Sequence, residues 1–164
     1  MGKRRKLTAG EIALAKTAFR DKIDYSAVRL SEGPGNNAAA HIAFMKGNPA
    51  ITIGNTIYFK VGFAADFSVS GADGRTFMHE MTHVWQYRTL GMTAFFIRYG
   101  TDLAKVGGKP NDMYKYAETT KFSEAMIETQ AQIVGDYHRA KTDGNAAATA
   151  RLAKNLAGSG LYNF

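Results

Sequence analysis

Two histidines and a glutamate form the pattern His-Glu-x-x-His at His79, Glu80 and His83, and an α-helix would turn this spacing into a metal site. With about 3.6 residues per turn, side chains four positions apart stand above one another on one helix face. Both imidazoles could then reach a single cation, with Glu80 beside them. Bound zinc lowers the pKa of its water from about 16 to about 7, and Glu80 could take the released proton. The pattern therefore predicts metal-assisted hydrolysis, most often of a peptide bond.

The alternative is an ordinary amphipathic helix that carries two surface histidines. A histidine that only packs in the core would lie within the apolar stripe of such a helix. Here His79 and His83 lie opposite that stripe, and the chain has only four histidines, so a chance match to the pattern is rare. We therefore favour a zinc site. The opposing stripe consists of Phe77, Met81, Val84 and Trp85.

A catalytic zinc site needs a third protein ligand besides the two histidines. The chain has no cysteine, so histidine and carboxylate side chains are the strong candidates. A metzincin would have glycine and histidine at positions 86 and 89, where this chain has Gln86 and Thr89. The metzincin class is therefore excluded.

A second class of such sites takes its third ligand, a glutamate, from a later helix. Glu124 and Glu128 are the candidates, and Ala131 and Gly135 continue their helix face with small residues that would permit close helix contact. We favour Glu128 as the ligand, with Glu124 either a ligand or a carboxylate that orients an imidazole. Both could instead be solvated surface groups. Asp102, after Gly100 and Thr101, resembles the aspartate of a third class and stays a weaker candidate.

Composition and charge narrow the functional classes. The 164 residues suit one folded domain, and we expect it to span residues 8–164 after a flexible basic tail at residues 1–7. The net charge of +7 comes partly from Lys3, Arg4, Arg5 and Lys6. No signature of nucleic-acid recognition accompanies that run, so we expect no nucleic-acid partner. The most apolar segment, residues 92–99, is too short to span a membrane.

The pattern of the first half predicts a helix and a small sheet ahead of the metal helix. Thr8 and Glu11 form a capping box for a helix over residues 9–21. The Gly54-Asn55 pair is a hairpin signal, so we expect an antiparallel sheet. We interpret the last strand as an edge to which an extended peptide could add, and His41 as a structural residue. The expected strands are residues 26–30, 41–45, 50–53 and 56–60.

The second half is predicted to be helical. Asp73 could cap the helix that carries His79, and Gly91 should end it near Leu90. Residues 61–74 read as a loop, and Gly107-Gly108 as a clear break. The further predicted helices cover residues 92–105, 120–139 and 145–157.

Four segments resemble the Vgr-related zincin-like proteins of Gram-negative bacteria, which are often encoded near type VI secretion or Rhs elements. The segments are Leu7–Glu11, Phe19–Tyr25, His79–Gln86 and Glu128–Tyr137. The resemblance implies an α+β, gluzincin-like metallopeptidase fold in which a small antiparallel sheet packs beside the His-Glu-x-x-His helix and the C-terminal half is helical. The family has a Glu-Gln-Gln-Ala-like motif where this chain has Glu128-Thr129-Gln130-Ala131, and this favours Glu128 as the third ligand. The resemblance does not indicate a substrate.

An enzyme of this kind needs a donor to the oxyanion that forms during attack, commonly a tyrosine or a histidine. Tyr116, Tyr137 and His138 are the candidates that we retain, together with Tyr114. Core packing or surface exposure is the alternative for each of them.

The expected function is that of a zinc-dependent peptidase or amide hydrolase that acts on a peptide or protein substrate. The alternative is a non-catalytic zincin scaffold that binds secretion-spike, Rhs or toxin proteins. We expect the chain to be cytoplasmic where it is made, because no Sec-type signal follows its basic start, and to be a candidate for secretion by a type VI system.

Overall fold

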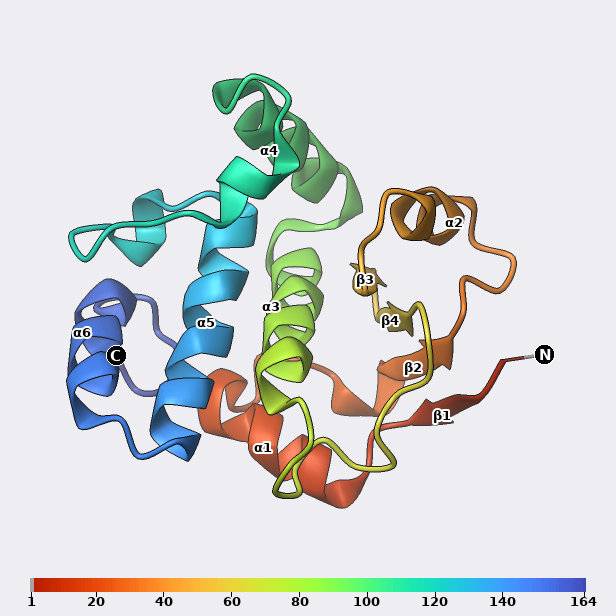
Figure 1. Ribbon diagram of the computed structural model, residues 1–164, viewed down its shortest axis with the longest axis horizontal. Coiled ribbons are helices and arrows are strands. Elements are labelled where there is room, and N and C mark those ends of the chain that lie inside the picture. Colours follow the sequence, from red (N-terminus) through yellow and green to blue (C-terminus); the bar gives the residue numbers. More distant parts are fainter. Residues whose placement is uncertain (1) are drawn as a thin grey trace.

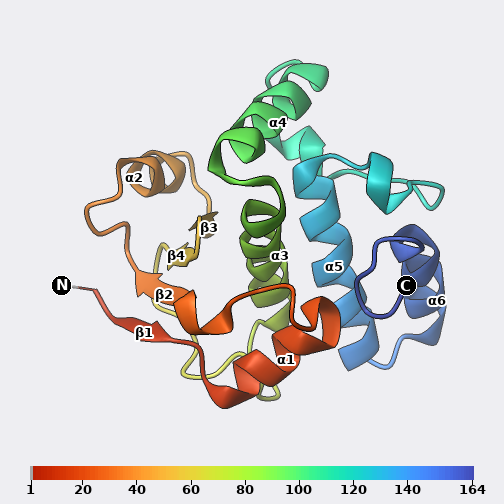
Figure 2. The same ribbon diagram turned by 180° about the vertical axis from the view of Figure 1, so that it is seen from behind.

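Two long helices, α3 (Gly74–Leu90) and α5 (Ile127–Thr142), run side by side through the middle of the molecule (Figure 1). This computed structural model describes residues 2–164, so Met1 of the expected tail lies outside the described residues. A small sheet lies on the free side of α3, and α6 (Ala146–Leu156) covers the opposite side of α5, as the reverse view also shows (Figure 2). The main hydrophobic cluster draws on residues from Leu7 to Leu161.

The remaining elements surround this central pair. Helix α1 lies across the base of α3, and α4 lies across the opposite ends of α3 and α5 (Figures 1 and 2). Among residues 2–164, no helix combines the length and the apolar character that crossing a bilayer requires. The helices are α1 (Ala9–Phe19), α2 (Ala38–Met45) and α4 (Met92–Lys105), and the short 3₁₀ turns are η1 (Tyr25–Ala27), η2 (Pro110–Tyr114) and η3 (Phe122–Glu124).

The sheet is mixed, so the prediction of an antiparallel sheet is wrong in part. Its strand order is β1-β2-β4-β3, and β2 pairs parallel to β4 while the other two pairs are antiparallel. The parallel pair arises because α2 and β3 carry the chain back before β4 begins. Strand β3 is one edge of the sheet and β1 the other, whereas β4, which we expected at the edge, lies inside. The strands are β1 (Arg4–Lys6), β2 (Arg29–Glu32), β3 (Ala50–Ile53) and β4 (Thr56–Phe59).

Residues 41–45, predicted as a strand, belong instead to helix α2. The Asn37 side chain accepts a hydrogen bond from the Ala40 amide at 3.0 Å, which caps the helix, and three successive alanines favour helix over strand. His41 is exposed, with its Nε2 3.1 Å from the Gly35 carbonyl oxygen, and it stays outside the site described below.

Several helix boundaries follow the local signals, and two do not. Asp73 caps α3 by accepting a hydrogen bond from the Thr76 amide at 3.0 Å, and α3 ends before Gly91, whose φ is 81°. Helix α1 ends at Phe19, two residues earlier than predicted, and α5 begins at Ile127 rather than near Thr120. The predicted strand at residues 26–30 is divided between the turn η1 and strand β2.

The expected flexible tail is wrong for residues 4–6, which form strand β1. Arg5 donates two hydrogen bonds of 2.7 Å to the carboxylate of Glu11, which is fully buried, and a third of 2.9 Å to the Ala64 carbonyl oxygen. The amides of Thr8 and Phe67 also donate to Glu11. The basic run therefore contains one arginine that neutralises a buried carboxylate at the start of α1.

We predict that Arg5→Ala lowers the free energy of unfolding by about 3 kcal/mol, because it leaves the buried Glu11 carboxylate without its cation. Chemical denaturation followed by circular dichroism measures this loss. Arg4→Ala removes an exposed charge from the same strand and should change stability by less than about 0.5 kcal/mol. Equal effects of the two substitutions would contradict a structural role for Arg5.

Candidate metal centre

Three side chains meet where α3 faces the start of α5. His79 and His83 come from α3, one turn apart, and Glu128 comes from the first turn of α5. The Oε2 atom of Glu128 lies 3.3 Å from His79 Nε2 and 3.2 Å from His83 Nε2, and the two Nε2 atoms are 3.3 Å apart. Within residues 2–164 this is the cluster of histidine and carboxylate donors able to share one ion.

The spacing of the donor atoms allows a test of whether zinc would fit. Zinc binds imidazole nitrogen and carboxylate oxygen at about 2.0–2.2 Å, so two ligand atoms of a tetrahedral site lie roughly 3.3–3.5 Å apart. The three distances of 3.2–3.3 Å agree with one face of such a tetrahedron. The donor set of two imidazoles and one carboxylate is also one that catalytic zinc sites use. The cluster therefore fits a zinc ion with its fourth position open.

Small residues bring the two helices close enough for Glu128 to reach the histidines. Gly135 packs directly on α3: a Cβ atom there would lie 2.9 Å from the carbonyl oxygen of Arg75 and 3.5 Å from the Cβ of His79. Ala131, one turn earlier, is fully buried. The close contact that these small residues predicted is present in the structure.

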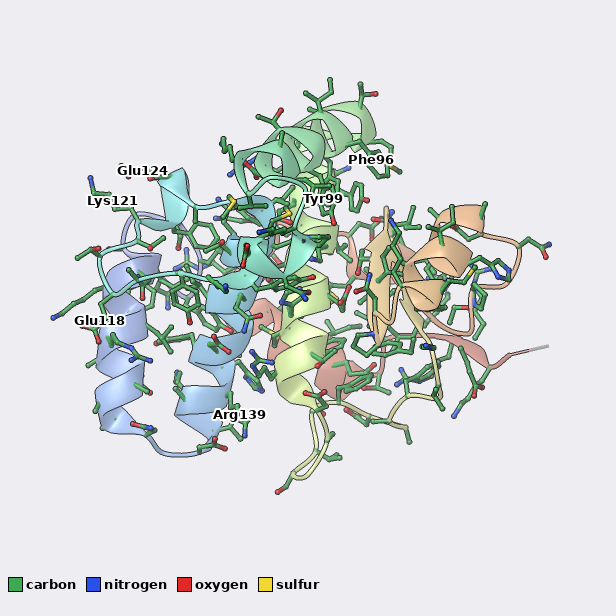
Figure 3. The ribbon with its side chains drawn as sticks, turned by 45° about the horizontal axis from the view of Figure 1, so that its top comes forward. Phe96, Tyr99, Glu118, Lys121, Glu124 and Arg139 are labelled. Atoms are coloured by element: carbon green, nitrogen blue, oxygen red, sulfur yellow. The ribbon has the colours of Figure 1, made fainter. Side chains whose placement is uncertain are left out.

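The other two carboxylates considered for the third position lie elsewhere. Glu124 is in η3, its side chain is 68% exposed, and it pairs with Lys121 at 3.2 Å, pointing away from α3 (Figure 3). Asp102 is buried, and its Oδ2 accepts a hydrogen bond of 3.0 Å from the Ile127 amide. Asp102 thus caps the start of α5 immediately before Glu128, and its role is to position rather than to bind.

A chain of amide side chains orients His83. The Gln86 Nε2 group donates to the Ile127 carbonyl oxygen at 2.9 Å and to Gln130 Oε1 at 3.0 Å. These two bonds fix the orientation of the amide, so its oxygen, Oε1, which can only accept, faces His83. His83 Nδ1 lies 2.8 Å from that oxygen and must carry a hydrogen. Nδ1 is therefore the donor to Gln86, and Nε2 is the ring nitrogen that faces Glu128. His83 and Gln86 are three residues apart and are therefore neighbours on one face of α3. This spacing could have predicted their contact from the sequence.

Glu80 lies beside the cluster and is held by the edge of the sheet. The hydroxyl of Thr52, in β3, donates to Glu80 Oε2 at 2.7 Å, and both side chains are buried. The other carboxylate oxygen, Oε1, is free of this bond. Nothing in the local sequence around Thr52 indicated this contact, because it joins residues 28 positions apart.

Burial and the pairing of His83 with Glu128 act in opposite directions on the pKa values of these two groups. Burial by itself would lower the pKa of the His83 imidazole, but the charge and hydrogen bond of Glu128, together with Glu80 and Gln86, outweigh burial and raise the pKa to about 9. Burial would raise the pKa of the Glu128 carboxyl, yet the nearby imidazoles lower it. Without a metal, the pair is thus an imidazolium and a carboxylate at neutral pH.

The three donors and Glu80 lie in the floor of a cleft of about 280 Å³ between the β3 edge and α4. Tyr114 also lines the cleft, and its ring stacks on that of His79 with 5.9 Å between centroids. Burial, aided by the charge of Glu128, raises the pKa of the Tyr114 phenol, which therefore keeps its proton. Tyr87 and Tyr99 line the same cleft and were not among the expected site residues.

The structure does not bring Tyr116, Tyr137 or His138 to this cleft. The hydroxyl of Tyr116 donates to Asp136 Oδ2 at 2.7 Å, and the ring of Tyr137 packs in the core. His138 lies behind the start of α3, where its ring contacts Gly74. Tyr137 and His138 belong to α5 but lie on faces of that helix away from the cleft, and Tyr116 lies in the segment between η2 and η3. Tyr114 is the earlier candidate that the fold brings to the cluster.

The chain is similar to a protein family, to a known protein and to a solved structure. Residues 11–91 match the eCIS core domain, a stretch that ends with α3 and so excludes Glu128. The type VI secretion system spike protein VgrG2b of Pseudomonas aeruginosa is 32% identical over 164 aligned residues, which include 91% of this chain and 14% of that protein. The solved effector domain of VgrG2b is 31% identical, with a TM-score of 0.66, over 92% of this chain and 82% of that domain.

We predict that Gly135→Ala weakens zinc binding by at least about 10-fold, because the added methyl group must push α5 away from α3 and withdraw Glu128. Competition with a fluorescent zinc chelator measures the affinity. Gly100→Ala is the matched control, since Gly100 is helical and has open space around it. Retention of full zinc affinity by Gly135→Ala would show that close helix contact does not set the site.

We also predict that zinc binding at pH 7 releases at least about one proton, because His83 must become neutral before its Nε2 can bind a metal. Since the pKa of His83 is about 9, zinc affinity should rise by at least about tenfold per pH unit between pH 7 and 9, and ionisation of a zinc-bound water adds to this slope. Calorimetry at one pH in buffers of different ionisation enthalpy counts the protons. Binding without proton release would show that His83 is already neutral.

Proposed function

We propose that this chain, which belongs to the family of the VgrG2b effector domain, is a zinc-dependent peptidase or amide hydrolase. Membership in that family makes the chain Vgr-related and links it to type VI secretion. The observation that carries the proposed activity is the triangle of His79, His83 and Glu128 donors, with Glu80 buried beside it at the floor of one cleft. The zincin-like fold inferred from the sequence is part of the same proposal.

Each side chain of the site then has a role in hydrolysis. His79, His83 and Glu128 would hold the zinc ion, which supplies a more acidic water and a positive charge near the scissile carbonyl. Glu80 accepts the proton of the attacking water and passes it to the leaving amine. Thr52 fixes Glu80 Oε2 and leaves Oε1 for that proton. The protonated Tyr114 phenol donates to the developing oxyanion.

The edge strand gives an extended substrate a place to bind. β3 pairs with β4 on one side only, and its Thr52 contacts Glu80, so a peptide strand that adds to β3 would pass over the catalytic carboxylate. This replaces the earlier expectation that residues 56–60 provide the edge. Backbone hydrogen bonds to β3 would align the scissile carbonyl without demanding a particular sequence.

The biological setting comes from the relatives. The related domain is described as the effector domain of VgrG2b, and VgrG2b as a spike protein of a type VI secretion system. This chain spans only 14% of that protein's length. We propose that the chain likewise acts as an effector that a type VI system delivers, with spike or Rhs proteins as its carriers and a protein or peptide of the target as its substrate.

The description of VgrG2b as a spike protein also supports a second function. In this alternative the same scaffold binds spike or toxin proteins without turning over a substrate. Zinc binding does not separate the two functions, because both would retain the cluster. Catalysis by Glu80 does separate them, since a scaffold has no use for a general base.

We predict that Glu80→Gln lowers hydrolysis of an unstructured protein or a peptide library by about 10²–10⁴-fold while zinc content stays the same. Glutamine keeps the shape of the side chain but cannot accept the proton. Glu124→Gln, an exposed glutamate on the surface, is the control and should leave turnover unchanged. Absence of turnover in the zinc-loaded parent chain, with retained binding of spike proteins, would support the scaffold function instead.

A further inference from the structure

The part of the cleft away from the three metal donors is walled by apolar side chains. Ile42 in α2 and Ile51 and Ile53 in β3 form one wall, and Phe95 and Phe96 in α4 contribute to the other. Figure 3 shows Phe96 on the side of α4 that faces α3 and β3. The two walls belong to different parts of the chain and enclose one continuous space with the cluster at its floor.

Two of these side chains are partly exposed to solvent. Ile42 is 55% exposed and Phe96 is 49% exposed. Apolar groups that line a concave site and remain accessible gain most when a ligand covers them. Both residues lie beside a site that, as proposed, must receive a substrate.

The charged groups that line the cleft restrict the charge of the ligand side chain that can bind there. Its acidic groups are Glu80 and Glu128, both engaged in the chemistry, so a basic ligand side chain would have no free anion there. Its basic group outside the cluster is Lys46, at the end of α2. A basic side chain between Ile53 and Phe96 would therefore be desolvated without a partner.

We infer that the cleft is a specificity site that accepts one large apolar or aromatic side chain next to the scissile bond. Its volume of about 280 Å³, which also includes the space above the metal donors, suits one large side chain of an extended peptide rather than a larger ligand. Binding of that side chain between α2 and α4 would place the adjoining carbonyl over the cluster while the backbone adds to β3. This inference rests on the proposed function, because it names the residues that the hydrolase selects.

The test uses the full zinc-loaded chain and a set of quenched fluorescent peptides that differ at one position beside the cleaved bond. We expect kcat/KM for peptides with Phe, Leu or Met at that position to exceed kcat/KM for Lys by at least about 10-fold. Ile42→Asp and Phe96→Asp should each lower kcat/KM for the Phe peptide by a similar factor, chiefly through KM, and raise relative cleavage of the Lys peptide.

Matched controls keep this test specific. Met45→Asp changes a residue of α2 that is 87% exposed and outside the cleft, and Ile97→Asp changes a residue of α4 that is 65% exposed and also outside it. Both should retain the kcat/KM and the preference of the parent chain. Thermal unfolding of all four variants shows whether they fold, and loss of the preference in the controls would overturn the inference.

A binding measurement separates this inference from the proposed activity. The Glu80→Gln variant and labelled peptides report affinity by fluorescence polarisation without turnover. Preferential binding of Phe, Leu or Met peptides, lost in Ile42→Asp, supports the specificity site even if the parent chain hydrolyses nothing. Hydrolysis by the parent chain without any apolar preference would instead overturn the specificity site and leave the hydrolase intact.

Discussion

The close contact between α3 and α5 is the constraint on which the rest of this structure depends. Gly135 has no room for a side chain against the Arg75 carbonyl, and that proximity allows a glutamate on one helix to reach two histidines on the other. Asp102 fixes where α5 begins by capping Ile127. The lateral distance between the helices and the starting point of α5 together determine where Glu128 lies.

The site is a buried polar layer that the fold satisfies almost completely. Gln86 and Gln130 link His83 to backbone carbonyls, and Thr52 ties Glu80 to the sheet edge. Buried polar groups of this kind are costly when unpaired, and each one here has a partner that sets its orientation. The buried ion pair of His83 and Glu128 is a separate case. If a divalent cation bound, coordination bonds to the cation would replace this ion pair.

Local patterns were sufficient to predict how the helix that carries the candidate metal ligands begins, ends and orients its histidines. The helical spacing of His79 and His83, the capping residue Asp73 and the stop at Gly91 depend on neighbours in the sequence, and the structure agrees with each. Glu128 could be ranked above Glu124 because small residues follow it. Its burial was harder to foresee, because α5 is covered on two faces, by α3 and by α6.

Features that depend on distant contacts could not be predicted. The parallel pairing of β2 with β4, the ordering of Arg5 by Glu11 and the bond from Thr52 to Glu80 join segments with no local signal for one another. The prediction of a strand at residues 41–45 was wrong because a short apolar run suits a strand as well as a helix, and the distinguishing signals, the Asn37 cap and the alanines that follow it, lie before the run. Tyr116 and Tyr137, two of the candidate oxyanion donors, do not line the cleft for a related reason. The direction of each tyrosine side chain depends on how α5 and η2 pack against the rest of the protein.

X-ray absorption spectroscopy of the zinc-loaded chain, compared with Glu128→Gln, tests the central claim most directly. We predict one zinc per chain, bound by two imidazole nitrogens and by oxygen donors at about 2.0–2.2 Å, with the variant losing most of its affinity. Zinc that binds with unchanged affinity and coordination after Glu128→Gln, or with fewer than two imidazoles in the parent chain, would contradict the site.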